Sequence, residues 1–380
     1  MKGVNPFFRR LATSWTTTAP ILAVIVLALA WGRTIPPLVV GIAAVFLAAA
    51  VLAAVHHAEV IAHRVGEPFG SLVLAVAVTV IEVALIISLT VSGGPAASSL
   101  ARDTVFAAVM ITCNGIVGLS LLMAALRRRV AVFNAEGTGA ALATVATLAT
   151  LSLVLPAFTT TVSGPAFAPA QLAFAAFASI ALYGLFVLTQ TIRHREYFLP
   201  VETTGERGGR QGTKGGKPRS EAEHAAFPTN RAAMVSLALL LAALIAVVGL
   251  AKIEAPAIET VVRTARLPQA AVGVAIALLV LLPETLAAVR AARRARVQVS
   301  LNLAFGSAMA SIGLTIPTIA AASLWLEGPL LLGLGPTHIV LLGLTVVVAT
   351  LTVVPGRATL LQAGVHLTLF AAFLLLAVSP

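Results

Sequence analysis

Two carboxylates lie near the middle of long apolar segments, one in each half of the chain. Glu82 lies within Gly66 to Ser92, and Glu284 occupies a similar place within Pro268 to Arg290. Both segments are long enough to cross a bilayer. An ionised carboxylate in hydrocarbon is costly, so such a group is normally protonated, paired with a cation or exposed to a wet cavity. The pair therefore predicts a pathway for a cation and for protons.

Neutral oxygen ligands accompany these carboxylates. Thr79 lies one helical turn before Glu82 on the same face, and Pro283 removes a helix hydrogen bond beside Glu284 and so frees backbone carbonyls. The apolar segment after each carboxylate adds amide and hydroxyl groups: Thr112 and Asn114 in the first half, and Asn302, Ser307 and Ser311 in the second. Oxygen ligands suit calcium or sodium and are poor for zinc. We therefore predict a hard-cation site, with buried carboxylates paired across helices as the structural alternative.

His56, Glu59 and His63 are spaced three and four residues apart and so share one helix face. This spacing could bind a transition metal. The group lies at the end of its apolar segment, where polar residues meet water, so we favour a role in pH sensing or proton access. Glu67, ahead of Pro68, could belong to the same route or only complement the dipole of the next helix.

Other histidines and glutamates lie singly at the ends of apolar segments or in loops. No functional role is predicted for them: His338, His366, Glu136, Glu254, Glu259 and Glu327.

The composition is that of a polytopic membrane protein. Of the 380 residues, 59% are hydrophobic and only 10% are charged, and the mean hydropathy is +1.01. The net charge of +11 predicts no nucleic-acid partner, because the basic residues sit in short gaps between apolar runs. No phosphate-binding loop, nucleophile elbow or HExxH motif occurs. We therefore expect no cofactor, no enzyme activity and no nucleotide-driven pump.

Eleven apolar runs predict transmembrane helices, in an all-α integral membrane fold. They cover residues 16–32, 36–62, 69–91, 104–126, 138–158, 169–192, 231–251, 268–290, 299–324, 336–354 and 357–378. The break between the sixth and seventh runs, 193–230, is rich in glycine and charge, which predicts a flexible solvated tether.

The lysines and arginines predict the orientation of these helices. With the N-terminus in the cytoplasm, 20 of the 25 basic residues fall on the cytoplasmic side and the C-terminus is external. The remaining five are Arg33, Arg102, Lys252, Arg263 and Arg266. The bias supports the number of spans as well, because a missed or extra helix would mix the two sides.

Two groups of five helices remain once the first helix, within 1–35, is set aside. They occupy 36–192 and 231–380, flank the tether at 193–230, and each carries its carboxylate on the second helix. An odd number of spans per group places the two in opposite orientations. This pattern predicts inverted repeats, with the substrate site between them near the middle of the membrane.

Two motifs resemble those of the calcium:cation antiporter superfamily, and more closely its bacterial calcium/proton branch, which includes sodium-potassium/proton antiporters. The first is HHAEVIAHRVGEPFGSLVLAVAVTVIEVALIISL, and the second is LPETLAAVRAARRARVQVSLNLAFGSAMASIGLTIP. The resemblance implies that Glu82 and Glu284 bind the cation and exchange it for protons. It also matches Asn114, Gly306 and Ser307 to the motifs of the third helix in each repeat.

The chain also departs from the wider family. Where calcium/proton exchangers have Gly-Asn-Ala-x-Glu, this chain has AVTVIE up to Glu82 and LLPE up to Glu284, and a common Gln falls at Ala310. Fewer oxygens beside the acids leave sodium or potassium open as substrates.

The sequence thus predicts a bacterial inner-membrane antiporter that exports calcium in exchange for protons by alternating access. The expected partners are inorganic cations, protons and the lipid bilayer. A sodium or potassium/proton antiporter with the same site is the nearest alternative. A cation channel, or a membrane enzyme using His56, Glu59 and His63, is the alternative from another class.

Overall fold

A computed structural model describes residues 6–33, 36–66, 69–93, 98–200, 228–325 and 330–379. Within these ranges, ten helices are long and apolar enough to cross a membrane. The run expected at 16–32 belongs to α1 (Pro6–Ala30), whose apolar part, Trp15–Ala30, is shorter than the other ten. The chain is therefore a mainly α-helical, multi-pass membrane protein, as predicted.

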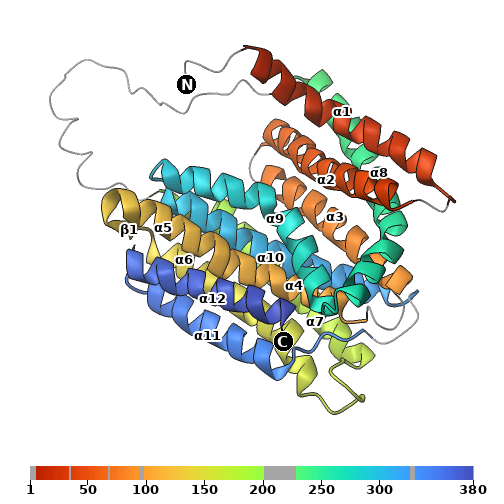
Figure 1. Cartoon of the computed structure of the whole chain (residues 1–380). Helices are drawn as coiled ribbons and strands as arrows, with labels where there is room; N and C mark the ends of the chain where they lie inside the picture. Colours follow the sequence, from red (N-terminus) through yellow and green to blue (C-terminus); the bar gives the residue numbers. More distant parts are fainter. Residues whose placement is uncertain are drawn as a thin grey trace.

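The first half of the chain forms seven helices and one strand (Figure 1). After α1 come α2 (Pro37–Val65), α3 (Phe69–Gly93), α4 (Leu100–Met110), α5 (Val117–Arg128), β1 (Val130–Val132), α6 (Ala135–Ala149) and α7 (Pro169–Leu188). A π-helical turn at Ile111–Ile116 joins α4 and α5 into one span. Further π-helical turns extend α6 at Thr150–Val154 and α7 at Thr189–Arg193.

The second half forms five helices and one strand. These are α8 (Asn230–Thr264), α9 (Gln269–Arg293), α10 (Val297–Ala322), α11 (Pro336–Val353), β2 (Arg357–Thr359) and α12 (Leu360–Val378). Four of the helices lie close to their expected ranges, but α8 continues well past its expected end at residue 251. The charged side chains after residue 251 lower the local hydropathy without opposing a helix, and Pro256 is accommodated inside it.

The segment predicted as a tether is folded at its start. Arg195–Phe198 forms a 3-10 helix, Phe198 is buried, and its carbonyl oxygen accepts a hydrogen bond of 2.7 Å from Nδ2 of Asn302 on α10. Residues 201–227 of the predicted tether lie outside the described residues, and its last residue, Asn230, begins α8.

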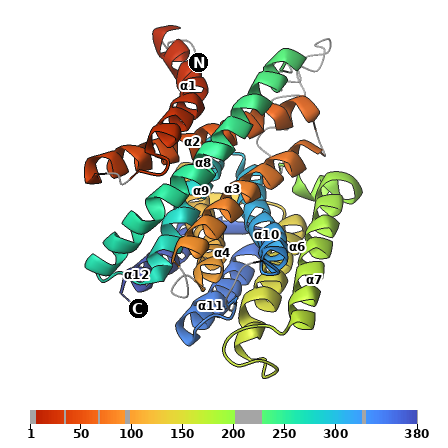
Figure 2. The ribbon, with the colours of Figure 1, turned by 90° about the vertical axis from the view of Figure 1, so that its right-hand side faces the viewer.

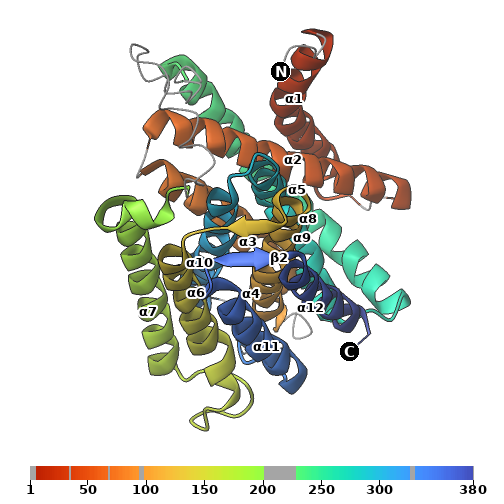
Figure 3. The same ribbon diagram turned by 90° about the vertical axis from the view of Figure 1, so that its left-hand side faces the viewer.

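One end of the helix bundle is marked by the two strands. β1 and β2 pair antiparallel, which brings the ends of α5 and α11 beside the starts of α6 and α12 (Figure 3). Arg127 Nη1 donates to the Arg293 carbonyl at 2.6 Å, and Arg64 Nε donates to Asn230 Oδ1 at 2.9 Å, so the ends of α9 and α2 and the start of α8 join them. Because arginines concentrate here, we call it the basic end.

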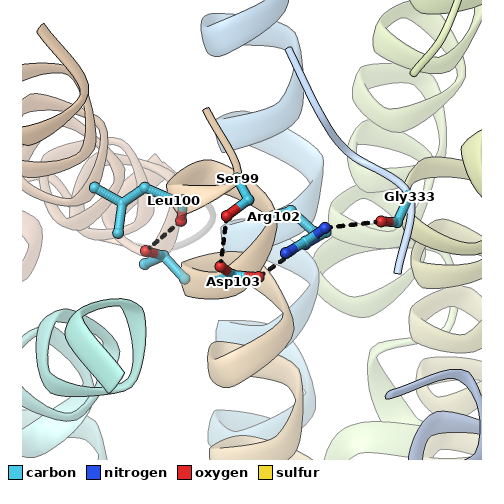
Figure 4. Close-up of polar contacts among 6 residues, drawn as sticks. Ser99, Leu100, Arg102, Asp103 and Gly333 are labelled. Carbon is cyan, nitrogen blue, oxygen red and sulfur yellow. Dashed lines mark hydrogen bonds and ion pairs between the residues drawn. The ribbon is translucent and has the colours of Figure 1, made fainter. Parts of the chain in front are cut away.

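The opposite end, called the far end, is held by loop contacts. Leu331 N donates to the Ser98 carbonyl at 3.3 Å, and Leu334 N donates to the Leu153 carbonyl at 2.8 Å. Figure 4 shows the polar group beside them, in which Arg102 pairs with Asp103 at 2.8 Å and also donates to the Gly333 carbonyl at 3.1 Å. These contacts connect the start of α4 with the loops before α7 and α11.

Two large apolar cores divide the helices into two bodies, and a third, small cluster connects α3 with α4 and α10. The smaller core is built from α1, α2, α3, α8 and one face of α9, and the larger from α4 to α7 and α9 to α12. Figure 2 shows α1, α2 and α8 together, on the opposite side of the molecule from α7 and α11. α9 contributes Ile276 and Val280 to the smaller core and Ala277 and Leu281 to the larger. α9 therefore lies at the boundary between the two bodies.

Gly273 brings α9 into close contact with α4. A Cβ atom at this position would lie 2.9 Å from the backbone nitrogen of Thr104 and 3.0 Å from the carbonyl carbon of Asp103. We expect Gly273→Ala to push the two helices apart and to cost about 1–3 kcal/mol of stability. Thermal unfolding of the purified protein in detergent measures this. Gly306→Ala is the matched control, because a Cβ there meets nothing within 4 Å, and an equal loss of stability in both variants would contradict the prediction.

Candidate functional site

A cavity of about 270 Å³ lies between α3, α7, α9 and α10. It receives Leu74 from the first turns of α3, Gln190 from just beyond α7, and Val299 from the start of α10. These positions are all near the basic end, whereas Glu82 lies in the middle of α3. The cavity therefore runs from the basic end to the middle of the bundle. Its polar lining residues are Thr79, Glu82, Tyr183, Gln190, Glu284, Asn302, Ser307 and Ser311.

Glu82 and Glu284, predicted from opposite halves of the chain, line this same cavity. Glu82 is 3% exposed, and Glu284 is partly buried. Ser311 of α10 lies 2.7 Å from Oε1 and 2.9 Å from Oε2 of Glu82, so its single hydroxyl proton is shared between the two oxygens. The first carboxylate is thus held by a helix of the second half of the chain.

Two buried oxygen atoms of the cavity-lining residues have no hydrogen-bond partner in the described part of the chain. They are Oγ1 of Thr79 and Oε2 of Glu284. Thr79 lies on the same face of α3 as Glu82, as its spacing predicts. Beside Glu284, Pro283 lacks the N–H that would reach the carbonyl of Leu279 within α9. Buried oxygens without partners are rare, and these two are open to contact with an ion or water in the cavity.

Asn302 and Ser307 also line the cavity, on the basic-end half of α10. The amide of Asn302 is partly engaged: its Oδ1 accepts from Gln298 Nε2 at 2.9 Å, while its Nδ2 donates to Phe198. Because an amide oxygen has two lone pairs, Oδ1 keeps one for a ligand. Gly306 faces open space beside Ser307 and leaves room for an ion.

Asn114 is not among the residues that line this cavity. It is fully buried in the π-helical turn, where Nδ2 donates to Thr345 Oγ1 at 2.9 Å and Oδ1 lies 3.2 Å from His366 Nδ1. These partners belong to α11 and α12. Thr112, in the same turn, donates to the Ala108 carbonyl at 2.7 Å. Asn114 and Thr112 are thus engaged within the larger body.

His56, Glu59 and His63 are all exposed on α2. Among the described residues, no group of three or more His, Cys, Asp or Glu side chains is arranged to hold a metal ion. Glu67 lies outside the described residues. The neighbouring His57 is instead buried: Nε2 lies 2.9 Å from the Thr16 carbonyl, and Nδ1 lies 3.3 Å from Ser236 Oγ. It joins α2 to α1 and α8.

Sequence reasoning did not single out several polar residues near or in the site. Tyr183 comes from an apolar stretch of α7, and Gln190 comes from the turn that follows α7, between Thr189 and Thr191. His366 was treated as isolated, yet it is fully buried and also contacts Thr352 Oγ1 at 3.2 Å. Their position inside predicted membrane spans could have identified them, because polar side chains there need partners.

The cavity offers two carboxylates and neutral oxygens, and none of the nitrogen or sulfur ligands that zinc prefers. Such a set can bind a hard cation, and its carboxylates can carry protons when no cation is present. The chemistry available is therefore an exchange of bound ions without a covalent step.

The chain is similar to known proteins over nearly its whole length. Residues 35–192 and 235–379 match the family described as "Sodium/calcium exchanger protein". The chain is 44% identical over 369 residues to the putative ionic transporter y4hA of Sinorhizobium fredii, covering 96% of each chain. It is 33% identical over 362 residues to the sodium-potassium/proton antiporter ChaA of Escherichia coli, covering 94% of each.

Solved structures with the same fold include native YfkE and the H⁺/Ca²⁺ exchanger CAX. Each superposes with a TM-score of 0.67 over 97% of this chain, covering 99% of YfkE and 88% of CAX, at 15% and 20% sequence identity. At this identity they show the fold alone. Together with the family match, the comparisons show that the chain is a transporter and not an enzyme, and that it belongs to the sodium/calcium exchanger protein family of the calcium:cation antiporter superfamily.

Proposed function

We propose that this protein exports calcium from the bacterial cytoplasm in exchange for protons, and that Glu82 and Glu284 carry both kinds of ion. The observation that supports the proposal most directly is that the two carboxylates line one cavity with Thr79, Ser307 and Ser311. With both carboxyl groups protonated the site is neutral, and with both ionised around one calcium ion it is neutral again. A buried site avoids the states in between, because uncompensated charge is costly there.

The ligand set fits calcium in number as well as in type. Calcium takes about 6–8 oxygen ligands. Two carboxylates supply up to four, and Thr79, Ser307, Ser311 and Asn302 each carry a further oxygen at the cavity. In the proposed loaded state, the Ser311 hydroxyl turns a lone pair to the ion. Asn114 is left out of this proposed ligand set because its amide contacts α11 and α12.

Sodium or potassium in exchange for protons is the second candidate. The relative ChaA, 33% identical over nearly the whole chain, is a sodium-potassium/proton antiporter. A monovalent ion would leave one of the two carboxyl groups protonated in the loaded state, so the same residues can serve both candidates.

The division into two bodies supports alternating access. α3 and α9, which carry the carboxylates, both contribute to the smaller core, while α10 belongs to the larger. We propose that movement of one body against the other closes the cavity toward the basic end and opens a path at the far end. The concentration of arginines supports placing the basic end in the cytoplasm, with the N-terminus on that side and the C-terminus outside.

Everted membrane vesicles with an acidic interior test the proposal. We expect added calcium to dissipate the proton gradient, read with a pH-sensitive dye, in vesicles that contain the protein and not in vesicles without it. A response to sodium or potassium alone would replace calcium by the second candidate. If none of the three cations moves protons, the proposed antiport is wrong.

Ser311→Ala should weaken cation binding. Removal of the hydroxyl deletes a contact to both oxygens of Glu82 and one proposed ligand of the ion, and a hydrogen bond to a charged group is worth about 1.5–3 kcal/mol. We therefore expect the half-saturating calcium concentration for exchange to rise by roughly tenfold or more. Thr318→Ala is the matched control, since this hydroxyl is exposed on the same helix and bonds only to the Leu314 carbonyl. Equal half-saturating calcium concentrations in the Ser311→Ala variant and the wild type would contradict the proposal that Ser311 is a ligand of the ion.

A further inference from the structure

A second cavity, of about 450 Å³, lies at the far end of the bundle between α2, α3, α8 and α9. It receives Val40 from the start of α2, Leu89 from the end of α3, Val262 from the end of α8 and Ala271 from the start of α9. All of these positions are remote from the basic end. The cavity therefore lies on the opposite side of the bundle's middle from the one that contains Glu82 and Glu284.

The two cavities occupy successive stretches of the same two helices. On α3, Glu82 lines the first cavity, and Leu85, one turn further, lines the second. On α9, Leu281 lines the first cavity and Leu279 the second. Between them lie Val83 on α3 and Val280 on α9, which are both buried. A thin apolar layer thus separates the second cavity from the proposed ion site.

Glu254 is the one titratable side chain in the described lining of the second cavity. It is 3% exposed, and its Oε1 has no hydrogen-bond partner in the described part of the chain. α2, α3 and α9 present only apolar residues to the cavity. The nearest basic residue on α8, Lys252, is directed elsewhere: its Nζ lies 5.5 Å from the centre of the Trp31 ring on the far-end side of α1. Neither ion pair of the described residues involves Glu254, so no described cation compensates a charge there.

A single carboxylate in an apolar wall is a poor site for a metal cation, which needs several oxygens, but a proton needs only one. We propose that Glu254 is a proton-binding residue at the far end, which passes protons between that side and Glu82 and Glu284 and does not itself bind the transported cation. The inference rests on the proposed antiport. It assigns a role to a buried charge that packing does not explain, because a leucine would fill the same space at lower cost.

Exchange in proteoliposomes tests this role, with the pH set separately on each side. In Glu254→Gln we expect the maximal rate of exchange to fall by about tenfold or more and no longer to depend on the pH at the far end. The half-saturating cation concentration at the basic end should stay unchanged. Glu254→Asp should restore part of the rate and the pH dependence. Glu136→Gln, which removes an exposed carboxylate of α6, is the matched control. A Glu254→Gln variant with wild-type rate and pH profile would overturn the inference.

Chemical labelling separates this inference from the proposed function. Dicyclohexylcarbodiimide reacts with protonated carboxyl groups in apolar surroundings. Digestion of the labelled protein and mass spectrometry of its peptides locate the adduct. We expect Glu254 to be labelled in the wild type, and less so as pH rises, even if the transported cation is other than calcium. If Glu254 stays unmodified at every pH tested, the inference is wrong whatever the transport assay shows. If the Glu82→Gln variant loses exchange while its Glu254 is still labelled, the result supports both the proposed antiport and the proposed role of Glu254.

Discussion

Glu82→Gln should reduce proton-coupled cation exchange by about a thousandfold, which corresponds to about 4 kcal/mol. The glutamine keeps the shape of the side chain and can still accept a hydrogen bond from Ser311, but it can neither release a proton nor neutralise a cation in a site where the native side chain is 3% exposed. Glu284→Gln should have a loss of similar size, because one carboxylate cannot balance a divalent ion.

Initial rates of cation-dependent proton flux, normalised to the amount of inserted protein, measure the effect. Glu136→Gln is again the control, since that side chain is exposed in the first turn of α6 and should leave the rate unchanged. Robust exchange by both the Glu82 and the Glu284 variant would remove the central carboxylates from the mechanism.

Asp103→Ala should have the largest effect on stability. Asp103 is 5% exposed at the start of α4, pairs with Arg102 at 2.8 Å and accepts from Ser99 Oγ at 2.9 Å (Figure 4). Its loss leaves a partly buried guanidinium without its counter-charge, and breaking a buried pair from one side costs about 3–5 kcal/mol. Because backbone atoms of Asp103 and Thr104 also contact Gly273 of α9, the damage should reach the helix that carries Glu284.

Thermal unfolding in detergent, followed by tryptophan fluorescence or by loss of a monodisperse elution peak, measures this cost. Glu136→Ala, which removes an exposed acid, should change stability by less than about 0.5 kcal/mol. Should Asp103→Ala unfold at the same temperature as this control, the contacts at the far end do not stabilise the fold.

The helices could be located from the sequence because a bilayer imposes a length and a hydropathy that can be counted. The expected boundaries were least accurate where charged residues lower the hydropathy of a helix that continues. In α8, the charged residues after Ala251 ended the predicted span, yet backbone hydrogen bonding carries the helix on to Thr264. The π-helical turn at Ile111–Ile116 was also not predicted: its polar residues Thr112 and Asn114 were noticed, but their presence does not specify a π-helical hydrogen-bond pattern.

The residue types of the candidate site could be predicted from the sequence. The directions in which their side chains point could be predicted less well. Glu82, Glu284, Thr79, Ser307, Ser311 and Asn302 all line one cavity, because each lies on a helix at the boundary of the two bodies. Asn114 was expected with them, but a polar residue in a span turns to whichever partner packing supplies, and here the partners are Thr345 and His366. Pairwise contacts between distant helices are not encoded in hydropathy.

Proton release on cation binding tests the central claim most directly. Calcium is added to the purified protein in weakly buffered detergent solution, and the pH change is recorded alongside the amount of calcium bound. If cation and protons compete for Glu82 and Glu284, about two protons should leave per bound calcium ion, and Glu82→Gln and Glu284→Gln should each abolish the release. Calcium binding without proton release would contradict the account, because the two ions would then not share one site.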